Sequence, residues 1–226
     1  PRIANFDDLD PLKSEENVKL EIIEAGKPLP SDCDLILLPG SKGTLADLSY
    51  LYEQGWDIDI KAHVRRGGHV IGLCGGYQML GQVVRDPQGL EGNLKELKGL
   101  GLLGIETVLE GDKTLTKATG YSLSDQLEIS GYEMHMGVSV QTGDDHAFLM
   151  VNGQHEGFIS QNGLVSGTYV HGLFESDAFR GGYLRKIKDN FASQVNYHDQ
   201  IERTLDDLAN FIEEHCDLDQ ILAHAR

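Results

Sequence analysis

The segment from His69 to Gly81 constrains the fold more than any other part of this sequence. The apolar run His69-Val70-Ile71 predicts a short buried strand, and the apolar residues after Cys74 follow the spacing of a helix. A sharp turn between a strand and a helix needs residues without a Cβ, and glycines occupy positions 72, 75 and 76. The pattern therefore predicts a central strand, a strained turn that carries Cys74, and a helix that packs back on the strand.

This placement gives the thiol of Cys74 a chemical role. At the N-terminus of a helix the dipole favours a thiolate, which is the nucleophilic form of cysteine. The N–H group of Gly75 points to where an oxyanion would form during nucleophilic attack. The alternative, a buried structural cysteine beside a glycine turn, accounts less well for where the glycines stand.

Composition and charge narrow the class of protein. The chain has 226 residues, of which 40% are hydrophobic, enough for one large domain or two small ones. The net charge of −17 argues against nucleic acid and anionic membrane surfaces as partners. Neither a transmembrane run nor a signal peptide is evident. Because the sequence begins with Pro1 rather than Met, we expect a piece of a longer polypeptide.

The three cysteines, Cys33, Cys74 and Cys216, indicate a reducing cytoplasm. An odd number without C-x-x-C spacing predicts neither a disulfide framework nor a zinc site, so we expect no metal. Cys216 continues an apolar helical stripe and is expected to pack, and Cys33 is expected to be inert.

The first half of the chain predicts an α/β architecture. Val18–Ile23 alternates like a strand, whereas 34–38 is a continuous apolar run typical of a strand buried on both faces of a parallel sheet. The loop 39–43 that follows lies where open α/β sheets bind ligands. Helices are expected from Thr44, as its N-cap, and over 57–66. This order favours a doubly wound, mostly parallel central sheet.

From about residue 99 the pattern changes to short alternating strands separated by glycines, which predict an antiparallel extension of the sheet. Two helices, over about 177–192 and 199–223, are expected to close the chain. The expected strands are 106–110, 113–121, 128–134, 138–141, 157–160 and 164–170.

A cysteine nucleophile needs a proton acceptor, and nine histidines compete for that role. His171 ends an apolar strand and is followed by glycine, which places its imidazole at a strand end. His135 lies in a similar glycine-bounded segment, 131–137, and stays an alternative. His63 is expected on a solvated helix face. The sequence alone favours His171 as the base.

Together these segments resemble the class I (triad-type) glutamine amidotransferases, which have a flavodoxin-like fold. The finer features resemble one branch of that family, the glutaminase domains of cobyric acid synthases, over about residues 1–190. Seven separated segments agree in order: Asn5–Leu12, Leu37–Thr44, Cys74–Gly81, Asp86-Pro87 with Glu91-Gly92, Gly99–Leu103, Gly131–Gly137 and Gly167–Phe174.

The resemblance implies a reaction and a role for each site residue. Cys74 would attack the side-chain amide of glutamine, His171 would move protons, and water would free glutamate from the thioester after ammonia leaves. The implied oxyanion groups are Gly40 and Gly75, and the implied substrate-binding residues are Gln78, Gly76 and His135. Many members carry an acid two residues after the histidine, where this chain has Leu173. Glu175 is therefore the candidate third member, and a Cys–His dyad is the alternative.

The resemblance also implies partners. In the branch, ammonia passes to an N-terminal synthetase domain of the same polypeptide, which uses ATP and Mg²⁺ to amidate carboxylates of a corrinoid, adenosyl-cobyrinic acid a,c-diamide, on the way to cobalamin. This chain has no G-x-x-x-x-G-K-[ST] phosphate loop. We therefore expect residues 1–226 to form a single glutaminase domain, the C-terminal part of a longer synthase, without a cofactor of its own.

Three alternatives remain open from the sequence. The first is the glutaminase of cobyrinic acid a,c-diamide synthase or of lipid II amidation. The second is a non-catalytic interaction module of the same fold, and the third is a cysteine peptidase or related hydrolase. The intact Cys74 and His171 count against the non-catalytic module.

Overall fold

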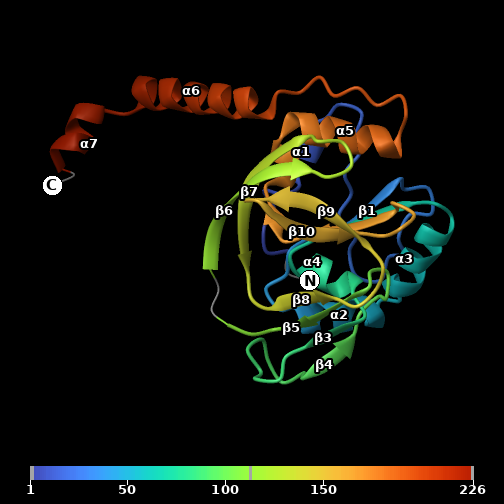
Figure 1. The fold of residues 1–226 in the computed structure, drawn as a ribbon. Coiled ribbons are helices and arrows are strands. Elements are labelled where there is room, and N and C mark those ends of the chain that lie inside the picture. Colours follow the sequence, from blue (N-terminus) through green and yellow to red (C-terminus); the bar gives the residue numbers. More distant parts are fainter. Residues whose placement is uncertain (1–2, 112–113, 225–226) are drawn as a thin grey trace.

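An eight-stranded mixed sheet forms the centre of the protein (Figure 1). The structure is a computed structural model that describes residues 3–111 and 114–224. Three neighbouring strands of the sheet are parallel: β1 (Leu35–Leu38), β2 (His69–Leu73) and β11 (Val165–Thr168). Strand β2, which leads to Cys74, lies between the other two and is buried along most of its length. The carboxyl ends of these strands therefore meet beside the cysteine.

The rest of this sheet is antiparallel. From β11 outward it contains β10 (Gln154–Ile159), β9 (His146–Val151), β6 (Thr114–Ser122), β7 (Glu128–His135) and β12 (Val170–His171). The predicted α/β fold with an antiparallel extension is confirmed. The parallel part is smaller than predicted, because strands after residue 113 are joined mostly by hairpins, which allow only antiparallel neighbours.

A second, four-stranded sheet lies beside the first. Its order is β4 (Glu96–Lys98), β3 (Val83–Arg85), β5 (Ile105–Val108) and β8 (Val138–Gln141). Strand β8 directly follows β7 along the chain, so the segment between them, 136–137, passes from one sheet to the other. This crossing point lies close to Cys74, as the contacts below show.

Helices cover both faces of the large sheet. The first layer contains α2 (Thr44–Glu53), α3 (Trp56–Arg65) and α4 (Gly75–Leu80), and its core includes Ile36, Val70, Tyr77 and Leu103. The other core contains Phe148, Leu149, Phe179 and Tyr183. It is covered by the short helix α1 (Asp10–Lys13), the 3₁₀ turn η1 (Leu173–Glu175) and α5 (Asp177–Ile187).

Two local predictions are wrong. The segment Val18–Ile23 forms no strand; Val18 and Leu20 pack against the core, so the alternation reflects burial of one side without pairing. His63 is only 3% exposed instead of solvated, because its ring lies over Gly68 and its Nε2 lies 3.0 Å from the carbonyl oxygen of His69.

The last two helices, α6 (Tyr197–His215) and α7 (Leu218–His224), extend away from the body of the protein (Figure 1). The predicted single helix is thus broken at 216–217. None of the described side chains of α6 is buried, and Leu205 and Leu208 of its apolar stripe are each 52% exposed. Cys216 is exposed as well, so the expectation that it packs is wrong. Among the described residues, no helix is long and apolar enough to cross a membrane.

These exposures predict unequal costs for the same substitution in two places. We expect Leu208→Ala in α6 to change the free energy of unfolding of this chain by less than about 0.5 kcal/mol, as is usual for surface sites. Leu149→Ala removes a fully buried side chain and is expected to cost about 2–5 kcal/mol. Urea unfolding of the two variants measures both values. Equal losses would show that the stripe of α6 is covered.

Candidate active site

Cys74 sits in a strained backbone conformation between β2 and α4. Its φ of 51° and ψ of −109° lie outside the regions that side-chain-bearing residues normally adopt. Such strain persists only where the surrounding structure fixes the backbone, and it concentrates at functional sites. Here the N–H of Cys74 donates to the carbonyl of Thr168 (2.8 Å), and its carbonyl accepts from Gln78 N–H (3.1 Å). The predicted elbow is confirmed.

The glycines of the elbow allow α4 to approach the sheet closely. A Cβ at Gly72 would lie 2.7 Å from the backbone of Gly76, and a Cβ at Gly76 would lie 2.0 Å from the carbonyl oxygen of Leu38 in β1. Both positions exclude any side chain. Gly76, expected to bind substrate, therefore lies in the packing between α4 and β1.

The two expected oxyanion residues lie at the contact between the 39–43 loop and the elbow. A Cβ at Gly40 would stand 2.9 Å from Cε1 of His171 and 3.8 Å from Cβ of Cys74. A Cβ at Gly75 would stand 2.9 Å from Cβ of Ser41. The structure thus brings Gly40, Gly75, Cys74 and His171 together, and glycine at position 40 leaves space next to the thiol.

His171 is buried and is held by a carboxylate from the start of the chain. Its Nδ1 lies 2.7 Å from Oδ2 of Asp8, and the other oxygen of Asp8 accepts the N–H of Gly172 (2.8 Å). Asp8 and His171 are each 2% exposed. Because Nδ1 is engaged by Asp8, Nε2 is the ring nitrogen that remains for the thiol of Cys74.

Burial of the imidazole by itself lowers the pKa of His171. The hydrogen bonds to Asp8 and Cys74 and the negative charges of these groups outweigh that effect and raise the pKa to about 9. The site therefore favours a protonated imidazole beside the sulfur.

Glu175, the acid expected to orient the base, does not contact the imidazole among the described residues; Asp8 occupies that position. Burial and the nearby charges of Asp8 and Asp7 raise the pKa of Glu175. Leu173 is buried in the core, as an apolar residue at that position requires. The sequence motif around Asp8 belonged to the resemblance, but nothing in it pointed to a base 163 residues away.

The ring of Tyr132 helps to fix the position of the His171 imidazole. The ring of Tyr132 stacks on His171 with 5.3 Å between centroids, and its hydroxyl accepts a hydrogen bond from Asn5 Nδ2 (2.6 Å). Strand β7 approaches closely because residue 131 is glycine: a Cβ there would lie 2.0 Å from the carbonyl oxygen of His171. From the N-terminal loop, Asp8 thus contacts the imidazole of His171 directly, and Asn5 contacts it through Tyr132.

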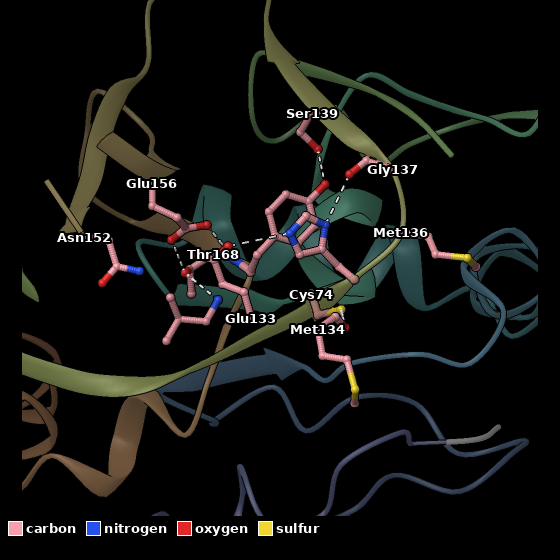
Figure 2. Close-up of polar contacts among 12 residues, drawn as sticks. Cys74, Glu133, Met134, Met136, Gly137, Ser139, Asn152, Glu156 and Thr168 are labelled. Carbon is pink, nitrogen blue, oxygen red and sulfur yellow. Dashed lines mark hydrogen bonds and ion pairs between the residues drawn. The ribbon is translucent and has the colours of Figure 1, made fainter. Parts of the chain in front are cut away.

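The other side of the thiol is bordered by the crossing between the two sheets (Figure 2). The thiol of Cys74 donates to the carbonyl oxygen of Met134, at a distance of 3.8 Å. Gln78, 2% exposed, donates from Nε2 to the carbonyl of Met136 (3.0 Å) and to the hydroxyl of Tyr169 (3.3 Å). Its Oε1 accepts from the hydroxyl of Thr44 (2.9 Å). The amide of Gln78 is thus already bonded within the protein.

His135 stacks on the ring of Tyr169, with 3.6 Å between centroids, instead of facing the sulfur. Its Nδ1 lies 3.2 Å from the carbonyl oxygen of Gly137, and its Nε2 lies 3.8 Å from a carboxylate oxygen of Glu133. The structure therefore places His171, and not His135, against Cys74.

Thr44 lies beside the elbow but does not cap α2 as expected. The N-cap residue is Gly43, and the N–H of Thr44 donates to the carboxylate of Glu91 (2.5 Å). The loop that carries Glu91 is itself organised by the buried Asp86, which accepts three backbone N–H groups. In the part of the chain that the structure describes, no group of three or more His, Cys, Asp or Glu residues forms a metal site.

A cysteine on a strained elbow, a buried histidine and a glycine loop at the ends of parallel strands define the class of triad-type glutamine amidotransferases. Comparison with known structures agrees on the fold. A crystal structure of a glutamine amidotransferase superposes with a TM-score of 0.61 at 14% identity and covers 82% of this chain and 94% of that one. The structure of PurLQS from Thermotoga maritima superposes with a TM-score of 0.59 at 16% identity and covers 80% of this chain and 92% of that one.

The sequence identifies the family. Residues 1–179 match the model of the CobB/CobQ-like glutamine amidotransferase domain, and this chain belongs to that family. It is 52% identical over 226 residues to the cobyric acid synthase of Methylocella silvestris, covering 100% of this chain and 47% of the relative. It is 50% identical over 221 residues to that of Ruegeria sp. strain TM1040, covering 98% and 45%. The chain thus spans about half the length of these curated relatives.

The contact between Asp8 and His171 predicts a change in titration. We expect Asp8→Asn to lower the pKa of His171 by about 1–3 units, because the substitution removes the negative charge and leaves the effect of burial. NMR titration of the ring of His171 measures the midpoint, which is expected at about 9 in the parent protein.

The same pair predicts how stability depends on pH. The pKa of His171 is raised on folding, so its contribution is complete below about pH 6.5, the ordinary value, and is lost as the pH rises through about 9. Asp8→Asn is therefore expected to destabilise more at pH 6 than at pH 10. A loss independent of pH, or an unchanged midpoint, would contradict the assigned pair.

Proposed function

We propose that this glutamine amidotransferase domain hydrolyses glutamine through a thioester on Cys74, with His171 as the proton carrier and Asp8 as the third member of a triad. The single observation that carries the proposal is the arrangement of three groups: Cys74 on a strained elbow, His171 beside it, and Asp8 on Nδ1. Asp8 holds the imidazole in one orientation and stabilises its protonated form, the task of the acid in a triad.

The proposed reaction uses each group in turn. The thiolate of Cys74 attacks the side-chain amide carbon of glutamine, and the oxyanion that forms is stabilised by the N–H groups of Gly40 and Gly75. Protonated His171 then gives its proton to the leaving nitrogen, and ammonia departs. Water gives a proton to neutral His171 and attacks the thioester, so that glutamate leaves and the thiolate of Cys74 and protonated His171 are restored.

We assign the other expected substrate residues to two tasks. Gln78 and His135 border the thiol through the crossing segment and Tyr169, so they shape the wall against which glutamine lies. Gly76 acts through close packing of α4 on β1, because no side chain fits there. None of the three is assigned a role in proton transfer.

We further propose that this domain supplies ammonia to a second half of the polypeptide, as in a cobyric acid synthase. Support comes from the relatives of that name, which are about 50% identical over nearly the whole chain and about twice its length. ATP, Mg²⁺ and the corrinoid, adenosyl-cobyrinic acid a,c-diamide, would bind that other half. The three free cysteines fit a reducing cytoplasm.

The proposed nucleophile is tested by covalent labelling. We expect a chloroketone analogue of glutamine to add one equivalent to the chain, at Cys74 and at neither Cys33 nor Cys216. Burial raises the pKa of Cys33, which disfavours its thiolate, and Cys216 is exposed between α6 and α7, outside the elbow. Peptide mass spectrometry locates the label.

Two histidine variants complete this test. His171→Ala is expected to slow glutamine hydrolysis by about 10²–10⁴-fold, the usual contribution of acid–base catalysis. His135→Ala, the matched control on the other side of the thiol, is expected to cost far less. A reversed order of the two effects would show that the base is assigned wrongly.

The ammonia-supplying role is tested in the full-length polypeptide. We expect Cys74→Ser to abolish corrinoid amidation with glutamine as the nitrogen donor and to leave amidation with added ammonium salts intact, because only the glutaminase step needs the thiolate. Mass spectrometry of the corrinoid product counts the amides formed. Glutamine-dependent amidation that survives the substitution would refute the proposal, and loss of both activities would show that Cys74 serves the other half too.

A further inference from the structure

Glu156 of β10 directs its carboxylate at the turn between β11 and β12 (Figure 2). One oxygen accepts the hydroxyl of Thr168 in a short hydrogen bond, and the other accepts the backbone N–H of Tyr169 at 2.7 Å. The oxygen of Thr168 in turn accepts the N–H of Val170 (3.0 Å). A single carboxylate thus engages two consecutive residues and, through Thr168, a third.

Both proposed catalytic side chains depend on this turn. The carbonyl of Thr168 accepts the N–H of Cys74 at 2.8 Å and thereby anchors the elbow. His171 follows directly after Val170 in β12. Between them, Tyr169 bonds Ser139 (2.7 Å) and Gln78 and stacks on His135. Any shift of the turn would change the distance between the sulfur and the imidazole.

No cation is described beside Glu156. The titratable groups that face it are Glu133 from β7 and the hydroxyls of Tyr77 and Tyr169. Both hydrogen bonds come from neutral donors. Burial of the carboxylate, which these two hydrogen bonds only partly offset, raises the pKa of Glu156 to about 7. The charged form of Glu156 therefore lowers the stability of the fold at neutral pH. A role in folding alone does not explain why an acid stands at this position.

We infer that Glu156 is a positioning residue of the glutaminase reaction, which holds the turn from Thr168 to Val170 so that Cys74 and His171 face each other. This inference rests on the proposed function, since it assigns Glu156 to the reaction of those two groups. Glu156 acts through the backbone and touches neither the sulfur nor the imidazole in the described contacts.

The test combines reactivity with stability in the 226-residue chain. Labelling of Cys74 by the chloroketone analogue gives a maximal rate and a half-saturating concentration. We expect Glu156→Gln to lower the maximal rate by about 10–100-fold, the size of a misplaced reacting group, with little change in the half-saturating concentration. The exposed neighbour on the same strand, His155→Gln, is the matched control and is expected to leave both values unchanged.

Thermal unfolding supplies the second readout. The folded pKa of Glu156 lies above the ordinary value of 4.5, so the folded state loses stability as the pH rises from 4.5 to 7. Glu156→Gln removes that charge, so its unfolding temperature at pH 8 is expected to equal or exceed that of the parent. Slower labelling without lost stability supports a positioning role. Slower labelling with a matching fall in unfolding temperature would overturn it in favour of a structural role.

A second pair of variants keeps the inference falsifiable if Glu156→Gln does not fold. Thr168→Val removes the bridging hydroxyl and keeps the shape, whereas Thr168→Ser keeps the hydroxyl. We expect the valine variant to label slowly and the serine variant to label nearly as fast as the parent. Equal rates in all variants would refute the inference. If the parent itself is not labelled at Cys74, the proposed function fails instead.

Discussion

The close approach of α4 to the parallel strands is the constraint on which the site depends. The backbone of Gly76 lies so near the carbonyl of Leu38 that no Cβ fits between them, and no Cβ fits between Gly72 and the backbone of α4 either. This packing fixes both ends of the elbow, so Cys74 holds a backbone conformation that an isolated peptide would not populate. The strain is therefore stabilised by the sheet, and the sulfur is presented in one direction.

The surroundings of His171 are assembled from distant parts of the chain. His171 lies on β12, while Asp8 and Asn5 come from the N-terminal loop. A buried ion pair fixes the segment after that loop: Arg180, fully buried, bonds Glu15 at 2.6 Å and also the carbonyl of Phe174. Removing one partner of such a pair typically costs about 3–5 kcal/mol. The segment after the loop that carries Asp8 is thus attached to α5 and to η1, which follows directly after His171 and Gly172.

The sequence predicted the elements whose signals are local. Glycines at an elbow, a continuous apolar strand and a histidine at a strand end are signals within a few residues, and they led to the prediction that Cys74 and His171 meet, as they do in the structure. The contact of Asp8 was not predicted, because the hydrogen bond that defines it spans the chain and an acidic turn has many uses. The stripe of α6 misled in the opposite sense: its spacing indicates an apolar face, but spacing does not show that anything covers it.

The two acids of the site, Asp8 and Glu156, have opposite energetic roles. Asp8 meets an imidazole that it helps to keep protonated, so its charge is compensated where it is buried. Glu156 meets only neutral donors, so burial acts on its own pKa. A fold optimised for stability would replace Glu156 by a neutral residue, whereas a carboxylate accepts from two donors at once and fixes both. A carboxylate that accepts from two neutral donors at the turn which anchors Cys74 is therefore understandable as a cost of geometry, offset by the packing of the rest of the domain.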